Sequence, residues 1–257
     1  MLKIENINVG YDGATVLHAI NAQFESGTLI ALVGPNGTGK SSLLKAIAGL
    51  IPSKGMVRLD GVTLNDMGRL NKVAYMPQDT GAQSSLTVLE VVLLGRLRSL
   101  GLRIGDDIKE QAIATLKRFR LEGFQDRAIG ALSGGQRQLV FLAQSLFRSP
   151  DVLLLDEPTA ALDLRHQLIV LEHISETCRI SGMIAVAAMH DLTLAARFAD
   201  RIVFLHDGQV AADGPSAQVI TPQILEQVYR VTAEVQPGPS GTLHVSPVRA
   251  LNDIQAR

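Results

Sequence analysis

The sequence predicts an α/β fold in which helices flank a mostly parallel β-sheet. Four apolar runs with turn residues at their borders are expected to be buried strands: Leu29–Val33, Val73–Met76, Val152–Leu155 and Ile184–Ala188. Three longer stretches between them place apolar residues at helical spacing: Ser41–Leu50, Gly135–Phe147 and Leu164–Cys178. Strands and helices therefore alternate along the chain, which is typical of layered α/β proteins.

The beginning of the chain has a different pattern, with short strands joined by turns. Residues 2–24 contain the turn Tyr11-Asp12-Gly13, and residues 56–64 contain the turn Asp60-Gly61. Because such short turns join neighbouring antiparallel strands, we expect an antiparallel β flank beside the parallel core.

The stretch from residue 86 to residue 148 is expected to be mostly helical, since apolar residues recur at helical intervals after Val88 and again after Ile113. We interpret it as a helical subdomain inserted into a core formed by residues 1–85 and 149–235. A single domain of 257 residues accommodates this arrangement.

The end of the chain is expected to be a tail, residues 236–257. Pro237, Gly238, Pro239 and Gly241 indicate a linker. A short strand is expected after them, at residues 242–245, and the last ten residues are expected to be mobile.

Composition argues against several classes of protein. A formal net charge of −1 and the absence of Trp disfavour nucleic-acid binding. The run Met183–Met189 is far shorter than the roughly 18 to 20 apolar residues that cross a bilayer. Glu5 interrupts any secretory signal, and the single cysteine, Cys178, excludes an internal disulfide. We therefore expect a cytosolic protein without a membrane span.

A glycine-rich loop follows the first predicted buried strand and precedes a helix. It fits the phosphate-binding pattern G-x-x-x-x-G-K-[ST] with these residues: Gly34, Pro35, Asn36, Gly37, Thr38, Gly39, Lys40 and Ser41. The glycines let backbone N–H groups face phosphate oxygens, and the helix adds its positive N-terminal end. Lys40 is expected to reach the β- and γ-phosphates of a nucleotide and Ser41 to bind Mg²⁺, and Ser42 is expected to contact the nucleotide as well. An ordinary glycine-rich turn would not explain the lysine and serine at these offsets, so a P-loop NTPase core is indicated.

Two carboxylates, Asp156 and Glu157, end a predicted buried strand. Because successive side chains of a strand face opposite ways, the two are expected to have different roles. Asp156 is expected to hold Mg²⁺, and Glu157 to orient and polarise the attacking water. Taken alone, an acidic pair at a strand end is commonly surface charge or a helix cap; the phosphate loop upstream makes the pair specific.

A third motif, Leu132-Ser133-Gly134-Gly135-Gln136, precedes an apolar helical pattern. By itself it would be a linker or a helix cap. Together with the other two motifs it resembles the signature of ATP-binding cassette (ABC) proteins, and the resemblance extends over essentially the whole chain. It implies an ATPase that works as a homodimer, with each nucleotide held between the phosphate loop of one chain and the signature of the other.

The resemblance also implies roles for four single residues. Tyr11 matches the aromatic residue that stacks on adenine, and Gln78 matches the glutamine that senses Mg²⁺ and the lytic water. Asp163 matches the loop that crosses the dimer interface, and His190 matches the histidine that contacts the γ-phosphate. None of them would indicate a function singly; their order along the chain does. The other five histidines are expected to be structural or on the surface.

More detailed similarity points to importers of iron-siderophore complexes, haem and cobalamin. It is carried by residues 86–96, 162–167, 213–215, 221–222 and 229–231. The resemblance implies two copies on the cytoplasmic face of the inner membrane, bound to permease subunits near residues 79–100, with a substrate-binding protein that supplies cargo. ATP binding is expected to close the dimer, and hydrolysis to reopen it.

Other functions remain open at the level of sequence. A soluble ABC ATPase, for example of the iron–sulfur cluster assembly type, and an exporter ATPase would carry the same motifs. A P-loop kinase or switch GTPase is disfavoured by the signature, by Gln78 and by His190. The cargo is not specified, because the residues that recognise it lie in partner proteins.

Overall fold

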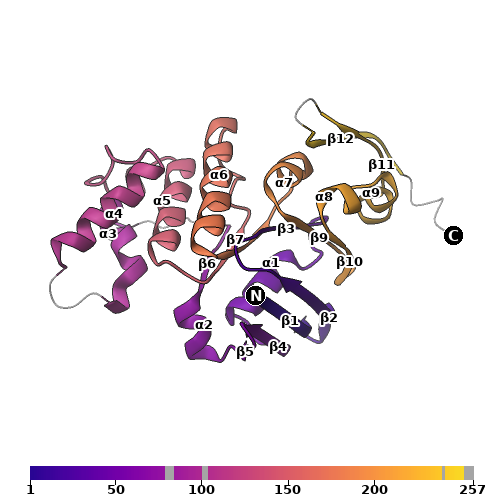
Figure 1. Ribbon diagram of the computed structural model, residues 1–257, viewed down its shortest axis with the longest axis horizontal. Helices are drawn as coiled ribbons and strands as arrows, with labels where there is room; N and C mark the ends of the chain where they lie inside the picture. The colour runs from indigo at the N-terminus through magenta and orange to yellow at the C-terminus, as the bar shows by residue number, and fades with distance from the viewer. Residues whose placement is uncertain (79–83, 100–103, 239–240, 252–257) are drawn as a thin grey trace.

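The computed structural model of the chain describes residues 1–78, 84–99, 104–238 and 241–251, and within them the strands form three sheets (Figure 1). The expected permease-docking segment, residues 79–100, lies partly outside the described residues, which omit 79–83 and 100. Among the described residues, no helix combines the length and apolar character needed to span a membrane.

A mostly parallel sheet forms the centre of the fold, in the order β10-β9-β3-β8-β7-β6. Its strands are β3 (Leu29–Val33), β6 (Val73–Met76), β7 (Val152–Asp156), β8 (Ile184–Ala188), β9 (Arg201–His206) and β10 (Gln209–Gly214). The four strands predicted from apolar runs are confirmed as β3, β6, β7 and β8, and every residue of β3, β7 and β8 is buried. Only β10 runs antiparallel to its neighbour, at one edge. The loops that follow the parallel strands therefore meet at one edge of the sheet.

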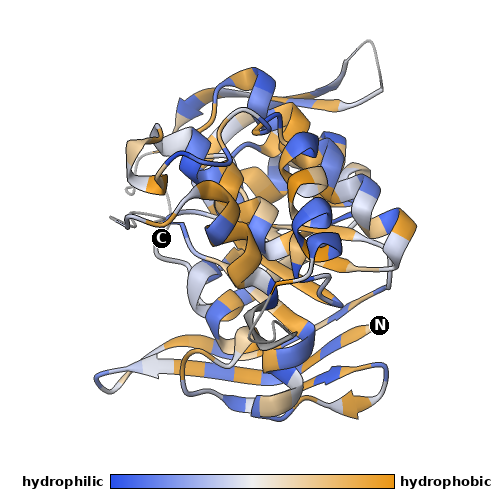
Figure 2. Ribbon diagram, turned by 90° about the vertical axis from the view of Figure 1, so that its left-hand side faces the viewer, coloured by the Kyte–Doolittle hydropathy of each residue, from blue (hydrophilic) through white to orange (hydrophobic). Residues whose placement is uncertain are grey.

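The expected antiparallel flank is a second sheet, in the order β2-β1-β4-β5. Its strands are β1 (Leu2–Tyr11), β2 (Ala14–Phe24), β4 (Lys54–Leu59) and β5 (Val62–Thr63). Asp12 and Gly13 join the first two strands with positive φ angles of 50° and 85°, as a tight hairpin requires. Hydrophobic and hydrophilic residues alternate along the strands at the bottom of Figure 2. Their apolar side packs with α1 (Lys40–Ala48) and one face of the central sheet into one core cluster.

Helices cover the other face of the central sheet, where α5, α6 and α7 lie in Figure 1. The helical stretch between residues 86 and 148 contains α3 (Val88–Leu93), α4 (Asp106–Arg118) and α5 (Gly134–Phe147), with 3-10 turns at Leu94–Ser99 and Ile129–Ala131. The chain then adds α6 (Leu164–Ser181) and α7 (Leu192–Phe198) after β7 and β8. A short helix that the sequence analysis did not anticipate, α2 (Asp66–Lys72), leads into β6. It begins at Asn65, whose side chain accepts a hydrogen bond from the amide of Gly68.

The C-terminal region differs from the expected linker and tail. After α8 (Ser216–Val219) and α9 (Pro222–Tyr229), the chain forms an antiparallel pair, β11 (Val231–Pro237) and β12 (Leu243–Ala250). Pro237 ends β11, and Gly238 and Gly241 lie between the two strands of this hairpin rather than in a linker. Its apolar residues pack against the main core, and β12 contacts α7. The strand expected at residues 242–245 is confirmed as the first part of β12, which continues to Ala250; residues 252–257 lie outside the described residues.

Candidate functional site

The predicted phosphate loop connects the end of β3 to the start of α1. Gly34, Gly37 and Gly39 have positive φ angles of 149°, 82° and 95°. A β-carbon on Gly34 would lie 2.2 Å from the carbonyl oxygen of Leu205, so the backbone approaches β9 too closely for any side chain. Gly39 precedes α1 in the left-handed conformation and supplies no side-chain cap. The first amides of α1 are therefore left for a ligand or solvent.

The loop encloses the side chain of Lys40. Its Nζ donates hydrogen bonds to the carbonyl oxygens of Gly34 and Pro35, at 2.7 and 2.9 Å. Only 6% of Lys40 is exposed, and burial lowers the pKa of its ammonium group against the opposing effect of the carboxylates of Glu157 and Asp156. The loop thus holds a buried cation at the base of the site.

Ser41 and Asp156 meet across the gap between α1 and β7. Ser41 Oγ donates to Asp156 Oδ1 at 2.9 Å, and the hydroxyl of Tyr75, on β6, donates to Asp156 Oδ2 at 3.2 Å. Burial and the neighbouring carboxylate raise the pKa of Tyr75, so the phenol remains a donor. No group of three or more His, Cys, Asp and Glu residues in the described part of the chain could hold a metal. A hard cation beside Ser41 and Asp156 would therefore take its remaining oxygen ligands from elsewhere, such as phosphates.

Glu157 departs from the expected strand geometry. The strand β7 ends at Asp156, and Glu157 has a positive φ of 52°. The two carboxylates are separated by this backbone turn rather than by the simple alternation of a strand. The side chain of Glu157 is held at both oxygens: Gln78 Nε2 donates to Oε2 at 2.7 Å, and His190 Nε2 lies 2.6 Å from Oε1.

Tyr11 lies at the end of β1, with 45% of its surface exposed. Its hydroxyl is 3.3 Å from Ser42 Oγ, on α1. The expected aromatic residue is thus placed beside the phosphate-loop helix with its ring open to solvent. Its stacking on adenine stays a prediction.

The signature residues form a second cluster. Ser133 caps α5: its hydroxyl accepts from the amide of Gln136 at 3.3 Å, while Gln136 Oε1 accepts from the amide of Ser133 at 3.0 Å. Gly134 and Gly135 lie with them along a hollow of about 720 Å³ that also includes Asp163. This hollow shares no residue with the cluster around Lys40 and Glu157. One chain therefore presents two separate parts of the predicted nucleotide site.

Asp163 begins α6 as its N-cap, with its carboxylate accepting from the amide of His166 at 2.9 Å. The imidazole Nδ1 of His166 lies at 2.9 Å from the same carboxylate. These bonds hold the pKa of Asp163 below its ordinary value. The sequence analysis assigned no role to His166; its spacing of three residues from a helix cap was the available signal.

Tyr75 is a further residue that the sequence analysis missed. It lies in a short apolar strand, where an aromatic residue is ordinarily part of the core. Only the three-dimensional pairing of β6 with β7 brings its hydroxyl to Asp156.

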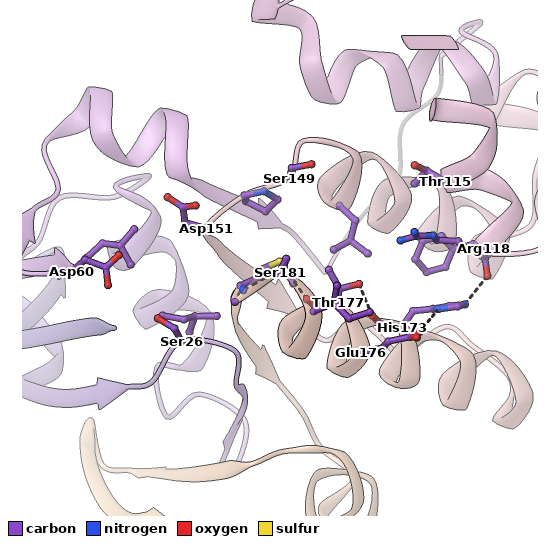
Figure 3. A pocket seen from close by; sticks show the side chains of 18 residues that line it. Ser26, Asp60, Thr115, Arg118, Ser149, Asp151, His173, Glu176, Thr177 and Ser181 are labelled. Atoms are coloured by element: carbon purple, nitrogen blue, oxygen red, sulfur yellow. Dashed lines mark hydrogen bonds and ion pairs between the residues drawn. The ribbon is translucent and has the colours of Figure 1, made fainter. Parts of the chain in front are cut away.

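A separate cavity of about 690 Å³ lies where α4 and α6 approach the first residues of β7 and β8 (Figure 3). Labelled residues around it include Arg118, Asp151 and His173, and His173 Nε2 is 2.7 Å from the carbonyl oxygen of Arg118. Since parallel strands begin at the edge opposite to their ends, this cavity and the cluster around Glu157 belong to opposite edges of the sheet. None of the predicted site residues lines it.

Comparisons with known proteins agree with these motifs. A model of the family described as ABC transporter matches residues 17–160. The chain is 40% identical to the hemin import ATP-binding protein HmuV of Streptomyces coelicolor, over 95% of this chain and 89% of that protein. It is 36% identical to the iron(3+)-hydroxamate import ATP-binding protein FhuC of Bacillus subtilis, over 93% of this chain and 91% of that protein.

A solved structure extends the similarity to the fold. It is the dimeric, post-hydrolysis state of an ATP-binding cassette bound to ADP and Pi, with a TM-score of 0.76 and 29% identity over 84% of this chain and 99% of that one. The family and the α/β fold class predicted from the sequence are thereby confirmed. The chain belongs to the ABC transporter family and is one of its ATPase subunits.

Proposed function

We propose that this chain is the ATP-hydrolysing subunit of a membrane importer for an iron-siderophore complex, haem or a cobalamin-type cargo. The observation that carries the proposal is a cluster at the carboxyl edge of the central sheet, where Lys40 and Ser41 of α1 meet Asp156 at the end of β7 and Glu157 in the turn that follows. The names of the hemin and ferric-hydroxamate relatives support the class of cargo.

Binding of ATP begins with the loop around Lys40. The ammonium group now donates to two loop carbonyls, and burial lowers its pKa. A bound β- or γ-phosphate would place anionic oxygens beside this buried cation, which favours the charged lysine and the bound phosphate together. The left-handed glycines and the uncapped start of α1 add backbone donors to the same phosphates.

The oxygen donors of Ser41 and Asp156 fit Mg²⁺, with Gln78 nearby through its contact with Glu157. A hydroxyl and a carboxylate oxygen 2.9 Å apart are a suitable edge for a hard cation that completes its shell with phosphate oxygens and water. When bound, Mg²⁺ would neutralise charge on the β- and γ-phosphates. Tyr75 would hold the remaining oxygen of Asp156 in place.

Glu157 is proposed as the base that orients and polarises the attacking water. Its two carboxylate oxygens are held by Gln78 and His190, at 2.7 and 2.6 Å. For hydrolysis, one oxygen exchanges its present partner for water, and the released Gln78 or His190 faces the reacting phosphate. A positioned base of this kind contributes on the order of 10²- to 10⁴-fold to a rate.

We further propose that the active form is a homodimer. The cluster around Lys40 and the hollow around Ser133 and Asp163 lie apart in one chain. In a two-fold dimer, Ser133 and the N-terminus of α5 would face the γ-phosphate bound to the other chain, and Asp163 would lie at the interface. The nucleotide-bound dimer of the similar cassette supports this arrangement.

The remaining partners follow from the importer function. We propose that the homodimer lies peripherally on the cytoplasmic face of the inner membrane, bound to permease subunits that receive cargo from a substrate-binding protein. The permease is expected to contact the described residues 84–99, where α3 begins with the capping box of Thr87 and Glu90. Nucleic acid is not an expected partner.

Replacement of Glu157 by Gln tests the chemistry. We expect Glu157→Gln to bind ATP as the wild type does, to lose turnover by roughly 10²- to 10⁴-fold, and to elute as a dimer with ATP on size-exclusion chromatography. Glu226→Gln, on the exposed side of α9, is the matched control and should behave as the wild type. A wild-type ATPase rate in Glu157→Gln would contradict the role of Glu157. An ATP-bound monomer would contradict the homodimer.

A further inference from the structure

Gln138 is a buried polar residue in the second turn of α5, the helix that begins at Ser133. Only 3% of it is exposed, and most of its buried neighbours on α5 are apolar. Its side-chain Nε2 donates a hydrogen bond of 2.9 Å to the backbone carbonyl oxygen of Glu157. A glutamine in the apolar face of a helix therefore reaches the residue proposed to activate water.

The backbone of Glu157 needs such support. Its φ of 52° is in the left-handed region, which is unfavourable for a residue with a β-carbon and persists only where neighbouring contacts fix it. Its carbonyl also accepts a longer bond, 3.3 Å, from the amide of Ala160 within the same loop. Gln138 supplies the shorter bond, and it comes from a different element.

The backbone conformation of Glu157 sets the direction of its side chain. Its carboxylate oxygens contact Gln78 and His190, which come from two other segments of the chain. A change at the carbonyl would move the carboxylate relative to these two partners. Since a misplacement of about 1 Å at a reacting group can cost on the order of 10²-fold in rate, the anchor at the carbonyl matters for hydrolysis.

The acceptor atom of the Gln138 side chain indicates that this residue does not serve to stabilise the fold. Its Oε1 is buried and has no hydrogen-bond partner among the described residues. A buried acceptor without a partner destabilises the folded state, so an apolar side chain of similar shape would be tolerated or even favoured there. The buried amide of Gln138 next to Glu157 therefore lowers the stability of the folded state.

The helix that carries Gln138 is also closely packed against the segment that follows Glu157. A β-carbon on Gly135 would lie 2.9 Å from the carbonyl oxygen of Ala161, so α5 touches this loop directly. Ser133, Gly135 and Gln138 thus lie on one helix that contacts the loop from Glu157 to Asp163.

We infer that Gln138 is a positioning residue for ATP hydrolysis, which fixes the backbone of Glu157 against the signature helix. The inference rests on the proposed role of Glu157. In a dimer, nucleotide bound to the second copy could shift the N-terminus of α5. Such a shift would be transmitted to Glu157 of the same chain through the hydrogen bond from Gln138.

The test replaces the amide and keeps the shape. In the purified full chain, Gln138→Met removes the donor, and we expect kcat to fall roughly 10- to 100-fold while the KM for ATP changes by less than about twofold, because the groups proposed to bind phosphate are untouched. The melting temperature should be unchanged or higher, because the unpartnered acceptor is removed. Gln144→Met, the same change on the same helix, is the matched control and should keep the wild-type kcat.

Gln138→Asn is the second variant. It keeps an amide but is one methylene shorter, so it should also lose kcat. A folded Gln138→Met or Gln138→Asn protein with the wild-type kcat would overturn the inference, even if its melting temperature were lower. Glu157→Gln measured in parallel separates the two failures: if Glu157→Gln is inactive and the Gln138 variants are not, only the role of Gln138 is lost.

Discussion

Gly34→Ala is the substitution whose effect the structure determines most directly. Two costs add at this position. A residue with a β-carbon at a φ of 149° is strained by about 1 to 3 kcal/mol. Its β-carbon would also lie 2.2 Å from the carbonyl oxygen of Leu205, an overpacking that costs about 1 to 3 kcal/mol. We expect a total loss of roughly 2 to 6 kcal/mol in the free energy of unfolding.

Gly37→Ala is the matched control within the same loop. Gly37 also has a positive φ, 82°, but a β-carbon there would meet nothing within 4 Å. It should therefore lose only the conformational part, about 1 to 2 kcal/mol. A larger loss in Gly34→Ala than in Gly37→Ala is therefore expected, mainly from the contact between the phosphate loop and β9.

Urea unfolding followed by circular dichroism measures both variants, since the chain has no Trp for fluorescence. The total expected loss is smaller than the stability of most domains, so Gly34→Ala should still fold. Equal losses for Gly34→Ala and Gly37→Ala, at equal denaturant slopes, would refute the reasoning about the approach of Gly34 to Leu205.

Two further predictions concern the groups around Asp156. Lys40→Ala should weaken ATP binding at least about tenfold, because it removes the buried cation proposed to bind the phosphates; isothermal titration calorimetry measures the affinity, and wild-type affinity would contradict the assignment. Tyr75→Phe should cost about 1 kcal/mol in the free energy of unfolding, because it removes one donor to Asp156. A stability equal to that of the wild type would show that the 3.2 Å bond contributes nothing.

The central parallel strands could be predicted from the sequence because burial on both faces leaves a continuous apolar run. Leu29–Val33 and Ile184–Ala188 are strands with the predicted bounds. Of the three predicted helices, α6 begins at the predicted residue, and α1 and α5 each begin one residue earlier. Local pattern and tertiary environment agree in these elements.

The C-terminal hairpin could not be predicted in the same way. Pro237 and Gly238 are typical of a linker, and the apolar residues of β11 are few. The pairing of β11 with β12 is stabilised by packing against the core and against α7, which a local pattern does not reveal. The strand β12 is accordingly twice as long as the four residues expected.

The same distinction applies to the candidate site: residues in short sequence motifs could be predicted, and contacts made through the fold could not. The sequence predicts Lys40 and Ser41 as site residues because a phosphate loop requires them at a fixed spacing, and it predicts Glu157 from its place at the end of a buried strand. The conformation of Glu157 could not be foreseen, since a strand pattern gives no sign of a positive φ at its end. Gln138 was missed because its contact with Glu157 joins residues 19 positions apart through the fold.

The importer function is best tested by a pull-down with Glu157→Gln protein and ATP from detergent-solubilised membranes of its source cell, with partners identified by mass spectrometry. The same protein without ATP, and Lys40→Ala with ATP, are the controls. We predict that a multi-span permease is recovered with the ATP-bound variant, and the identity of that permease would narrow the cargo. Recovery of soluble partners alone would contradict the importer function and favour an assembly-type ATPase.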